Sequence, residues 1–240
     1  MKLIIPCSLL VLCCFDGVAA VNWQQASLTY LYGTNYRIGD PKRHVLTLEH
    51  AANTSWGDSF LFIDHSVSTE SDHLTYGEWS PRLSLGKNSD IKFSNGLVKD
   101  ILLASTIEQG ERFTNFLYGV GLDLAIPGMK FTQLNLYRRQ NDLGADNYQA
   151  TLAWALPIQF GEQAVLYDGF IDYSSAHGEK STSVNFTSQL KFPIQHWFGV
   201  QDQIYLGTEI SLWKNKYHIA DSTALRSNEV NVNFLLKWLF

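Results

Sequence analysis

Carboxylates and aromatic rings alternate in the stretch from Trp56 to His65, which reads WGDSFLFIDH. If this stretch is a β-strand, alternate side chains share a face. The side chains on one face are Asp58, Phe60, Phe62 and Asp64. Carboxylates accept hydrogen bonds from hydroxyl and amino groups, and aromatic rings stack on flat heterocycles. The pattern therefore predicts a wall that binds small ring-bearing solutes with hydroxyls, provided that this face meets water.

Two architectures can hold such a strand. A soluble sandwich buries the apolar face against a second sheet, whereas a membrane barrel turns it to lipid and keeps the acidic face around water. The 240-residue chain has only 17% charged residues, against roughly 25% in an average soluble domain. It has no run of about 18 apolar residues, which excludes transmembrane helices. The net charge of -5 gives no reason to expect nucleic-acid binding.

The N-terminus has the pattern of a secretory signal peptide. Lys2 is followed by an apolar run from Leu3 to Phe15 and then by small residues that end at Ala20. We expect residues 1–20 to be removed, which leaves residues 21–240 as one domain. All three cysteines lie in the signal segment. The mature chain is therefore expected to have no disulfide, no thiolate metal site and no cysteine nucleophile.

Alternation of apolar and polar residues continues to the end of the chain. In the last segment, Val230, Val232, Phe234, Leu236, Trp238 and Phe240 share one face. Turn clusters separate twelve such segments, which predicts an all-β fold, a twelve-stranded antiparallel transmembrane β-barrel. The expected strands span about 27–33, 45–51, 56–65, 76–85, 97–108, 113–124, 129–139, 148–156, 165–173, 184–192, 204–212 and 230–240.

The connections and aromatic residues favour a bacterial outer membrane, where periplasmic turns are short and external loops are longer. The expected external segments are polar: 35–43, 66–75, 139–147, 174–182 and 214–228, with 108–112 as a short exception. The periplasmic segments 125–129 and 157–163 are compact, although 86–96 and 193–203 are not. The chain ends in Phe240, which resembles the C-terminal pattern of outer-membrane proteins.

Twelve strands lie between the roughly eight that side chains fill and the sixteen that leave a wide pore, so a narrow lumen is expected. Strand parity selects candidate solute-binding residues: Glu49, Asp58, Phe60, Phe62, Asp64, Tyr76, Glu78, Arg82, Asp168, Phe170 and Asp172. The same parity turns Glu108, Asp123, Arg139, Lys191 and Glu209 inward. An alternative remains open, in which the acids pair with the bases and fill the barrel without binding a solute.

Several motifs carry a family resemblance. Trp56–Asp64, the segment EWSPRLS at 78–84, Tyr36–Arg37 and Thr47–Glu49 resemble the nucleoside-specific channel-forming outer-membrane family, Tsx/OmpK-like. The resemblance implies a monomeric twelve-stranded barrel that conducts nucleosides and deoxynucleosides. It implies that the acids and rings of 58–64 contact the solute, and that external loops serve as phage receptors in some members. No cofactor is implied.

Other functions and roles compete with this interpretation. A non-specific small-solute channel and a surface receptor for phage or adhesion both fit a barrel. An outer-membrane hydrolase needs a nucleophile and a base, for which His65-Ser66 is the nearest pair, but no third orienting group accompanies it. His44 and His50 share the lipid-side parity, which argues against a metal site. Asp58 directly follows Trp56-Gly57 and could instead cap that turn.

Overall fold

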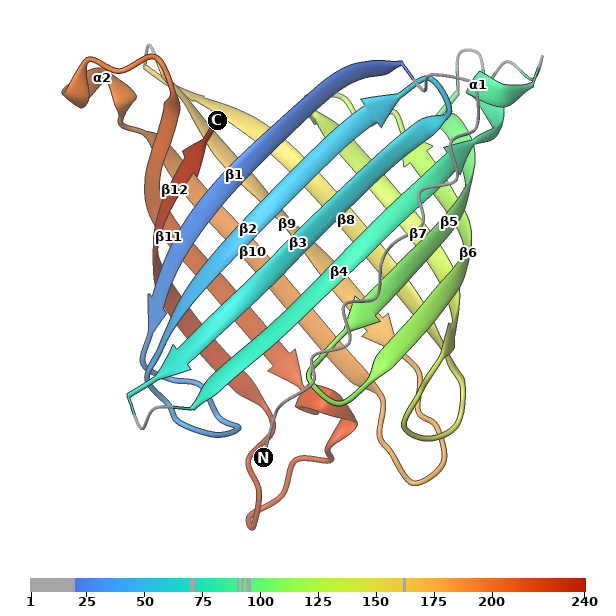
Figure 1. Ribbon diagram of the computed structural model, residues 1–240, viewed down its shortest axis with the longest axis vertical. Helices are drawn as coiled ribbons and strands as arrows, with labels where there is room; N and C mark the ends of the chain where they lie inside the picture. Colours follow the sequence, from blue (N-terminus) through green and yellow to red (C-terminus); the bar gives the residue numbers. More distant parts are fainter. Residues whose placement is uncertain (1–19, 70–71, 90, 92, 94–95, 162) are drawn as a thin grey trace, which may run out of the picture.

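The computed structural model describes residues 20–69, 72–89, 91, 93, 96–161 and 163–240. In this part of the chain, twelve strands form a closed barrel in which each strand pairs antiparallel with its sequence neighbours, and β1 pairs with β12 (Figure 1). The strands are β1 (Val21–Gly33), β2 (Arg43–Thr54), β3 (Gly57–Ser68), β4 (His73–Ser84), β5 (Val98–Gln109), β6 (Thr114–Leu124), β7 (Phe131–Gln140), β8 (Asn147–Phe160), β9 (Gln163–Ser174), β10 (Ser183–Pro193), β11 (Gln203–Lys214) and β12 (Glu229–Leu239). The predicted fold class is confirmed.

Alternation along each strand separates an apolar exterior from a polar interior. In β12, Val230, Val232 and Phe234 are exposed, whereas Asn231 and Asn233 between them are fully buried. Exposed apolar side chains on an entire barrel surface are unfavourable in water, but they match the hydrocarbon of a bilayer. The surface of the barrel is therefore consistent with a transmembrane position.

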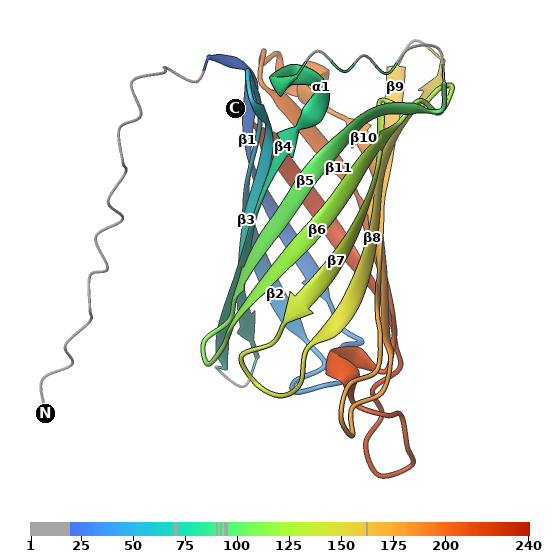
Figure 2. The same ribbon diagram turned by 90° about the vertical axis from the view of Figure 1, so that its right-hand side faces the viewer.

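The two ends of the barrel differ. The C-terminus lies at the end that carries the short helices α1 (Leu85–Asn88) and α2 (Gln195–Phe198) (Figures 1 and 2). The opposite end carries the connections β1–β2, β7–β8, β9–β10 and β11–β12, and the last of these includes the 3-10 helix η1 (Lys216–His218). These correspond to the predicted external loops. None of the helices among the described residues is long and apolar enough to cross a membrane.

The prediction of an external loop over residues 66–75 is wrong, because β3 continues to Ser68 and β4 begins at His73. Val67 pairs with His73, and the Ser68 amide donates to the Asp72 carbonyl. Polar side chains at a strand end resemble a loop in sequence although the backbone remains paired. The first strand is also longer than predicted: it starts at Val21, and the amide-rich segment from Val21 to Ala26 pairs with the end of β2. The expected signal peptide lies outside the described residues apart from Ala20.

The Trp-Gly-Asp sequence at 56–58 lies where the turn between β2 and β3 ends, and the close approach of β4 there requires a glycine. A Cβ atom on Gly57 would lie 1.9 Å from the carbonyl oxygen of Arg82, so only glycine lets β4 approach. The Thr54 hydroxyl accepts a hydrogen bond from the Gly57 amide at 3.2 Å and so caps the turn. The alternative role of Asp58 as the cap is therefore wrong.

Candidate functional site

Arg82 identifies the face of the strands that lines the interior. This side chain of β4 is only 3% exposed, donates to Asn135 of β7 at 3.3 Å and forms an ion pair with Asp123 of β6 at 2.9 Å. A β4 side chain can reach β7 only through the barrel, because two strands separate them in the sheet. Arg82 also binds Asp58, so the predicted acidic and aromatic face of β3 points inward.

A continuous strip of aromatic rings follows this inward face. The ring centroids of Phe60 and Phe62 are 6.1 Å apart, those of Phe62 and Tyr76 are 5.9 Å apart, and those of Tyr76 and Phe113 are 6.4 Å apart. Phe60 remains 40% exposed although it lies inside the barrel. We refer to these four rings as the aromatic strip. Its exposed ring edges and faces are available to a flat solute in the lumen.

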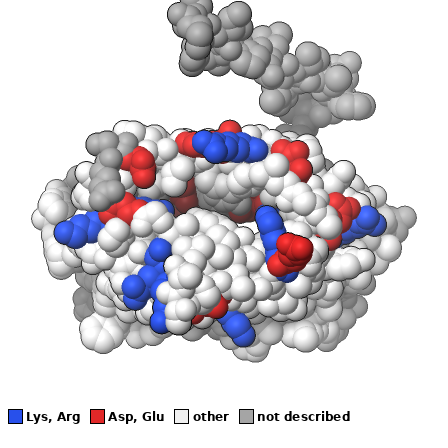
Figure 3. Space-filling model, turned by 90° about the horizontal axis from the view of Figure 1, so that it is seen from below, with Lys and Arg blue, Asp and Glu red and all other residues white. Residues whose placement is uncertain are grey.

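The part of the wall next to β3, formed by β2, β1 and β12, is closed. Inward-facing Leu31, Val45 and Leu235 form a buried apolar cluster across β1, β2 and β12. Asn231 and Asn233 beside it are fully buried. Seen from the loop-bearing end, the molecule is hollowed between the loops, with acidic atoms visible inside (Figure 3).

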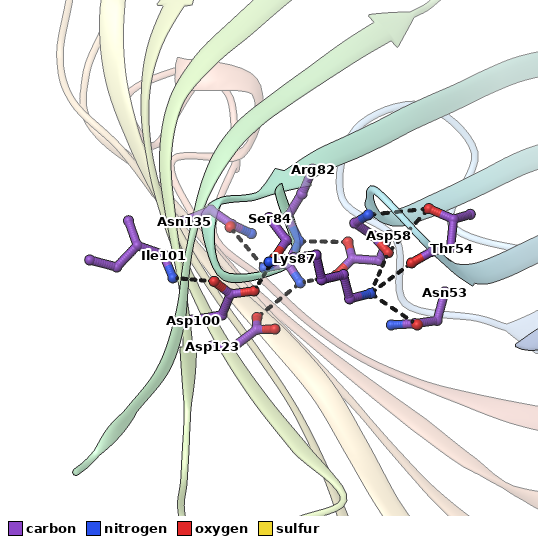
Figure 4. Close-up of polar contacts among 11 residues, drawn as sticks. Asn53, Thr54, Asp58, Arg82, Ser84, Lys87, Asp100, Ile101, Asp123 and Asn135 are labelled. Atoms are coloured by element: carbon purple, nitrogen blue, oxygen red, sulfur yellow. Dashed lines mark hydrogen bonds and ion pairs between the residues drawn. The ribbon is translucent and has the colours of Figure 1, made fainter. Parts of the chain in front are cut away.

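Five of the nine carboxylates predicted to face inward are paired with bases. Figure 4 shows the triad in which Arg82 bridges Asp58 and Asp123. Further ion pairs between inward side chains of the strands are Arg139 with Glu108 at 2.5 Å, Lys191 with Asp168 at 2.6 Å, and Lys237 with Glu49. For these five carboxylates, the alternative prediction that acids and bases inside the barrel pair with one another is therefore correct.

Four other inward carboxylates accept hydrogen bonds from neutral groups. Among the described residues, none of the four has a Lys or Arg nitrogen within ion-pair distance. The partners are Thr47 for Asp64 at 2.5 Å, Tyr76 for Glu78 at 2.6 Å, Thr151 for Asp172 at 2.5 Å, and Gln189 and Asn233 for Glu209 at 2.8 and 2.9 Å. Because a carboxylate has about four acceptor positions, each keeps capacity for hydroxyl or amino donors. Glu78 lies directly beside a ring of the aromatic strip.

The predicted residues thus divide by strand and by partner. Phe60, Phe62 and Asp64 of β3 lie beside Tyr76 and Glu78 of β4, as expected. Phe170 and Asp172 belong to β9, which is six strands away in the ring of twelve and faces them across the lumen. The other four predicted residues form ion pairs: Glu49, Asp58, Arg82 and Asp168.

Two features of the lumen were absent from the sequence prediction. Phe113 lies directly before β6, at the start of the predicted strand 113–124, and joins the aromatic strip with the parity of inward Asp123, although it was not among the predicted site residues. At the external mouth, η1 folds inward: Lys216 forms a buried ion pair with Glu229 at 2.7 Å and lies 5.5 Å from the ring of Tyr36. Burial lowers the pKa of the Lys216 ammonium, opposed by Glu229, and raises the pKa of the Tyr36 hydroxyl. This contact holds the β11–β12 connection over part of the opening.

The hydrolase candidate is not supported by the geometry. His65 points outward, where its Nδ1 lies 3.0 Å from the Thr75 hydroxyl and its ring stacks on His73. Ser66 is the next residue of the same strand and faces the opposite side. The two side chains therefore cannot form a dyad. His44 and His50 contact different partners, Tyr30 and Gln24, and do not share a ligand position.

Arg82 is predicted to be the main structural ion-pair residue of the lumen. Replacing Arg82 by methionine leaves the partly buried Asp58 and Asp123 without their cation, which costs up to about 3–5 kcal/mol. Urea unfolding in detergent micelles, followed by tryptophan fluorescence, measures this loss. The matched control is Arg138→Met, because Arg138 forms an ion pair with Asp146 on the surface and is 54% exposed. Equal stability of the two variants would contradict the structural role.

Residues 18–238 match the model of a family described as nucleoside-specific channel-forming protein, Tsx. The chain belongs to this family. No curated protein sequence matches the chain. A solved structure of a KdgM porin has a similar fold, with a TM-score of 0.53 and 10% sequence identity over 89% of this chain and 99% of that chain. At this identity the likeness supports the barrel fold alone.

Membership of the Tsx family establishes the general function. The protein is an outer-membrane β-barrel that forms a channel for small solutes. The family does not favour the receptor, the non-specific channel or the hydrolase as the main function. Two of the motifs in which the resemblance was found, residues 56–64 and 78–84, lie side by side on β3 and β4, and the first contributes Phe60 and Phe62 to the aromatic strip.

Proposed function

We propose that the channel passes nucleosides by diffusion along the aromatic strip. The observation that supports this proposal is the position of Glu78, which has no cationic partner among the described residues and lies beside the rings of Tyr76 and Phe62. A nucleoside joins a flat heterocycle to a sugar with hydroxyls. The base stacks on a ring, and the sugar hydroxyls donate to neighbouring carboxylates.

The proposed site is extended and has no single tight pocket. Stacking on an aromatic side chain contributes about 1–3 kcal/mol per base. Because conduction requires release, several modest sites along the strip serve better than one tight site. Asp64, Glu78 and Asp172 supply acceptors at successive positions, and Phe170 supplies a ring on the far wall. Glu49, Asp58, Arg82 and Asp168 shape the path through their ion pairs.

The proposal includes how the protein reaches and occupies the membrane. Residues 1–20 direct export and are cleaved after Ala20, and the first strand of the mature barrel begins at the next residue, Val21. The proposal includes a monomer, which is supported by the closure of the twelve strands: no second copy is needed to complete the barrel wall. Outer-membrane lipid covers its apolar exterior.

Uptake into proteoliposomes tests the nucleoside proposal. We expect radiolabelled adenosine to enter faster than glucose, although glucose is smaller, and the adenosine rate to saturate with concentration. Binding to the wall explains both results, whereas simple sieving favours the smaller solute. Liposomes without protein provide the background. A glucose rate above that of adenosine, without saturation by either solute, would contradict nucleoside specificity and leave a non-specific channel.

A further inference from the structure

Three histidines form a patch on the outward face of the barrel near its external end. His44 of β2, His65 of β3 and His73 of β4 are all exposed. The strand register places them in two adjacent rows: His44 and His73 both pair with Val67, and His65 pairs with Leu46 and Thr75. The rings of His65 and His73 stack with centroids 5.7 Å apart. We call these three residues the histidine patch.

The histidine patch lies at the height expected for lipid headgroups. The next outward positions toward the barrel centre are the apolar Leu46, Leu48 and Ile63, which are exposed to the surroundings of the barrel. Beyond the patch, the strands end and the polar connections begin. Side chains with an apolar body and a polar tip collect at this boundary. The patch therefore contacts the outer leaflet where the hydrocarbon meets the headgroups.

Hydrogen bonds to the Nδ1 atoms of two of these histidines orient their rings, so that the Nε2 atoms face this boundary. The Nδ1 atoms of His44 and His65 lie 2.7 and 3.0 Å from the hydroxyls of Tyr30 and Thr75. When the hydroxyl donates, the ring proton is on Nε2, which then donates to an external acceptor. The outward positions of β2, β3 and β4 in this half, all of them described by the structure, carry no carboxylate. Lys42, which is exposed and precedes β2, adds a cation.

An apolar groove lies directly below the patch. It has a volume of about 370 Å³, and its walls include Leu61, Ile63, Trp79 and Ile107. Glu78, whose side chain faces the lumen, and Glu111 of the β5–β6 connection also line it. Gly77 leaves it open, because this outward position between Ile63 and Gln109 has no side chain. Thr75, the partner of His65, lines the same groove. A hydrocarbon-filled groove and a group of hydrogen-bond donors thus meet at one place.

We propose that the histidine patch and this groove form a specific binding site for a phosphate-bearing lipid of the outer leaflet. The imidazole N–H groups and Lys42 bind the phosphate oxygens, and one acyl chain occupies the groove over Gly77. Charge-assisted hydrogen bonds favour an anionic phosphate over an uncharged headgroup. The site is on the outside of the wall that carries the aromatic strip and is independent of the solute path.

Native mass spectrometry of the full-length protein in detergent tests the site with two lipids that have the same chains. The probes are dimyristoyl phosphatidate and dimyristoylglycerol, which differ only in the phosphate. We expect wild-type protein to bind the phosphatidate about tenfold more tightly. Equal binding of the two lipids would overturn the proposal.

Variants then separate the patch from the groove. His44→Phe with His65→Phe and His73→Phe keeps the ring size and removes the N–H donors, so the preference for phosphatidate should disappear. His65→Phe alone, which perturbs folding less, should reduce it. Ile107→Trp fills the groove and should weaken the binding of both lipids equally. The control is His50→Phe, because His50 also faces outward on β2 but lies away from the patch. A triple variant or His65→Phe variant with unchanged preference, or Ile107→Trp with unchanged binding, would overturn the proposal.

Discussion

Replacing Phe60 and Phe62 together by alanine is expected to weaken adenosine binding in the lumen by about tenfold to a hundredfold. Each lost stacking contact costs about 1–3 kcal/mol, and 1.4 kcal/mol corresponds to a factor of ten. Phe60 is 40% exposed inside the barrel, so removing its ring leaves little buried cavity. The measurement is the nucleoside concentration that halves the single-channel current.

The matched control for the phenylalanine variant is Phe192→Ala. Phe192 of β10 is also exposed, at 43%, but it faces the outside of the barrel. We expect unchanged half-blocking concentration in this control and heat-modifiable migration in both variants. Loss of the folded band in the Phe60, Phe62 variant would mean that the rings stabilise the barrel. A folded variant with unchanged adenosine block would remove the aromatic strip from the solute path.

The second large effect is expected for Glu78→Gln combined with Asp172→Asn. These substitutions keep the size of the side chains and remove the charge that strengthens hydrogen bonds from sugar hydroxyls. Hydrogen bonds to charged groups contribute about 1.5–3 kcal/mol, so each replacement lowers the affinity for adenosine by about tenfold. The same current-block measurement applies to this variant.

A nucleoside without the 2′- and 3′-hydroxyls distinguishes the role of the carboxylates. For 2′,3′-dideoxyadenosine, the two replacements should have a clearly smaller effect, because two of the three sugar hydroxyls that donate to the carboxylates are missing. Asp146→Asn is the control, since Asp146 forms an exposed pair with Arg138 at the outside. An equal loss of affinity for adenosine and for its dideoxy form would show that Glu78 and Asp172 act through the shape of the lumen.

Strand periodicity was sufficient to predict the barrel and most of the inward wall. The side-chain period of two is a local property, so the inward direction of Phe60, Phe62 and Glu78 follows once the strands are placed. Boundaries were less certain where polar residues continue a strand. This explains the extra length of β1 before Ser27 and the short connection between Ser68 and His73.

The division of the carboxylates into paired and unpaired groups could not be predicted. Arg82 meets Asp123 and Asn135 across strands that are far apart in sequence, and parity alone does not select these partners. The same limit applies to Lys216, which lies outside the strands and reaches the lumen because its connection folds inward. Phe113 has inward parity in the predicted strand 113–124, but parity alone does not select its contact with Tyr76. The resemblance in 56–64 and 78–84 indicated the family but did not indicate these contributions from other segments.

Single-channel current in planar bilayers with added adenosine tests the central claim most directly. If adenosine binds along the aromatic strip while it passes, the current of wild-type protein decreases with adenosine concentration and saturates. Glucose at the same concentrations should leave the current nearly unchanged. A current that does not respond to adenosine, in a channel that conducts ions normally, would contradict the proposed nucleoside path.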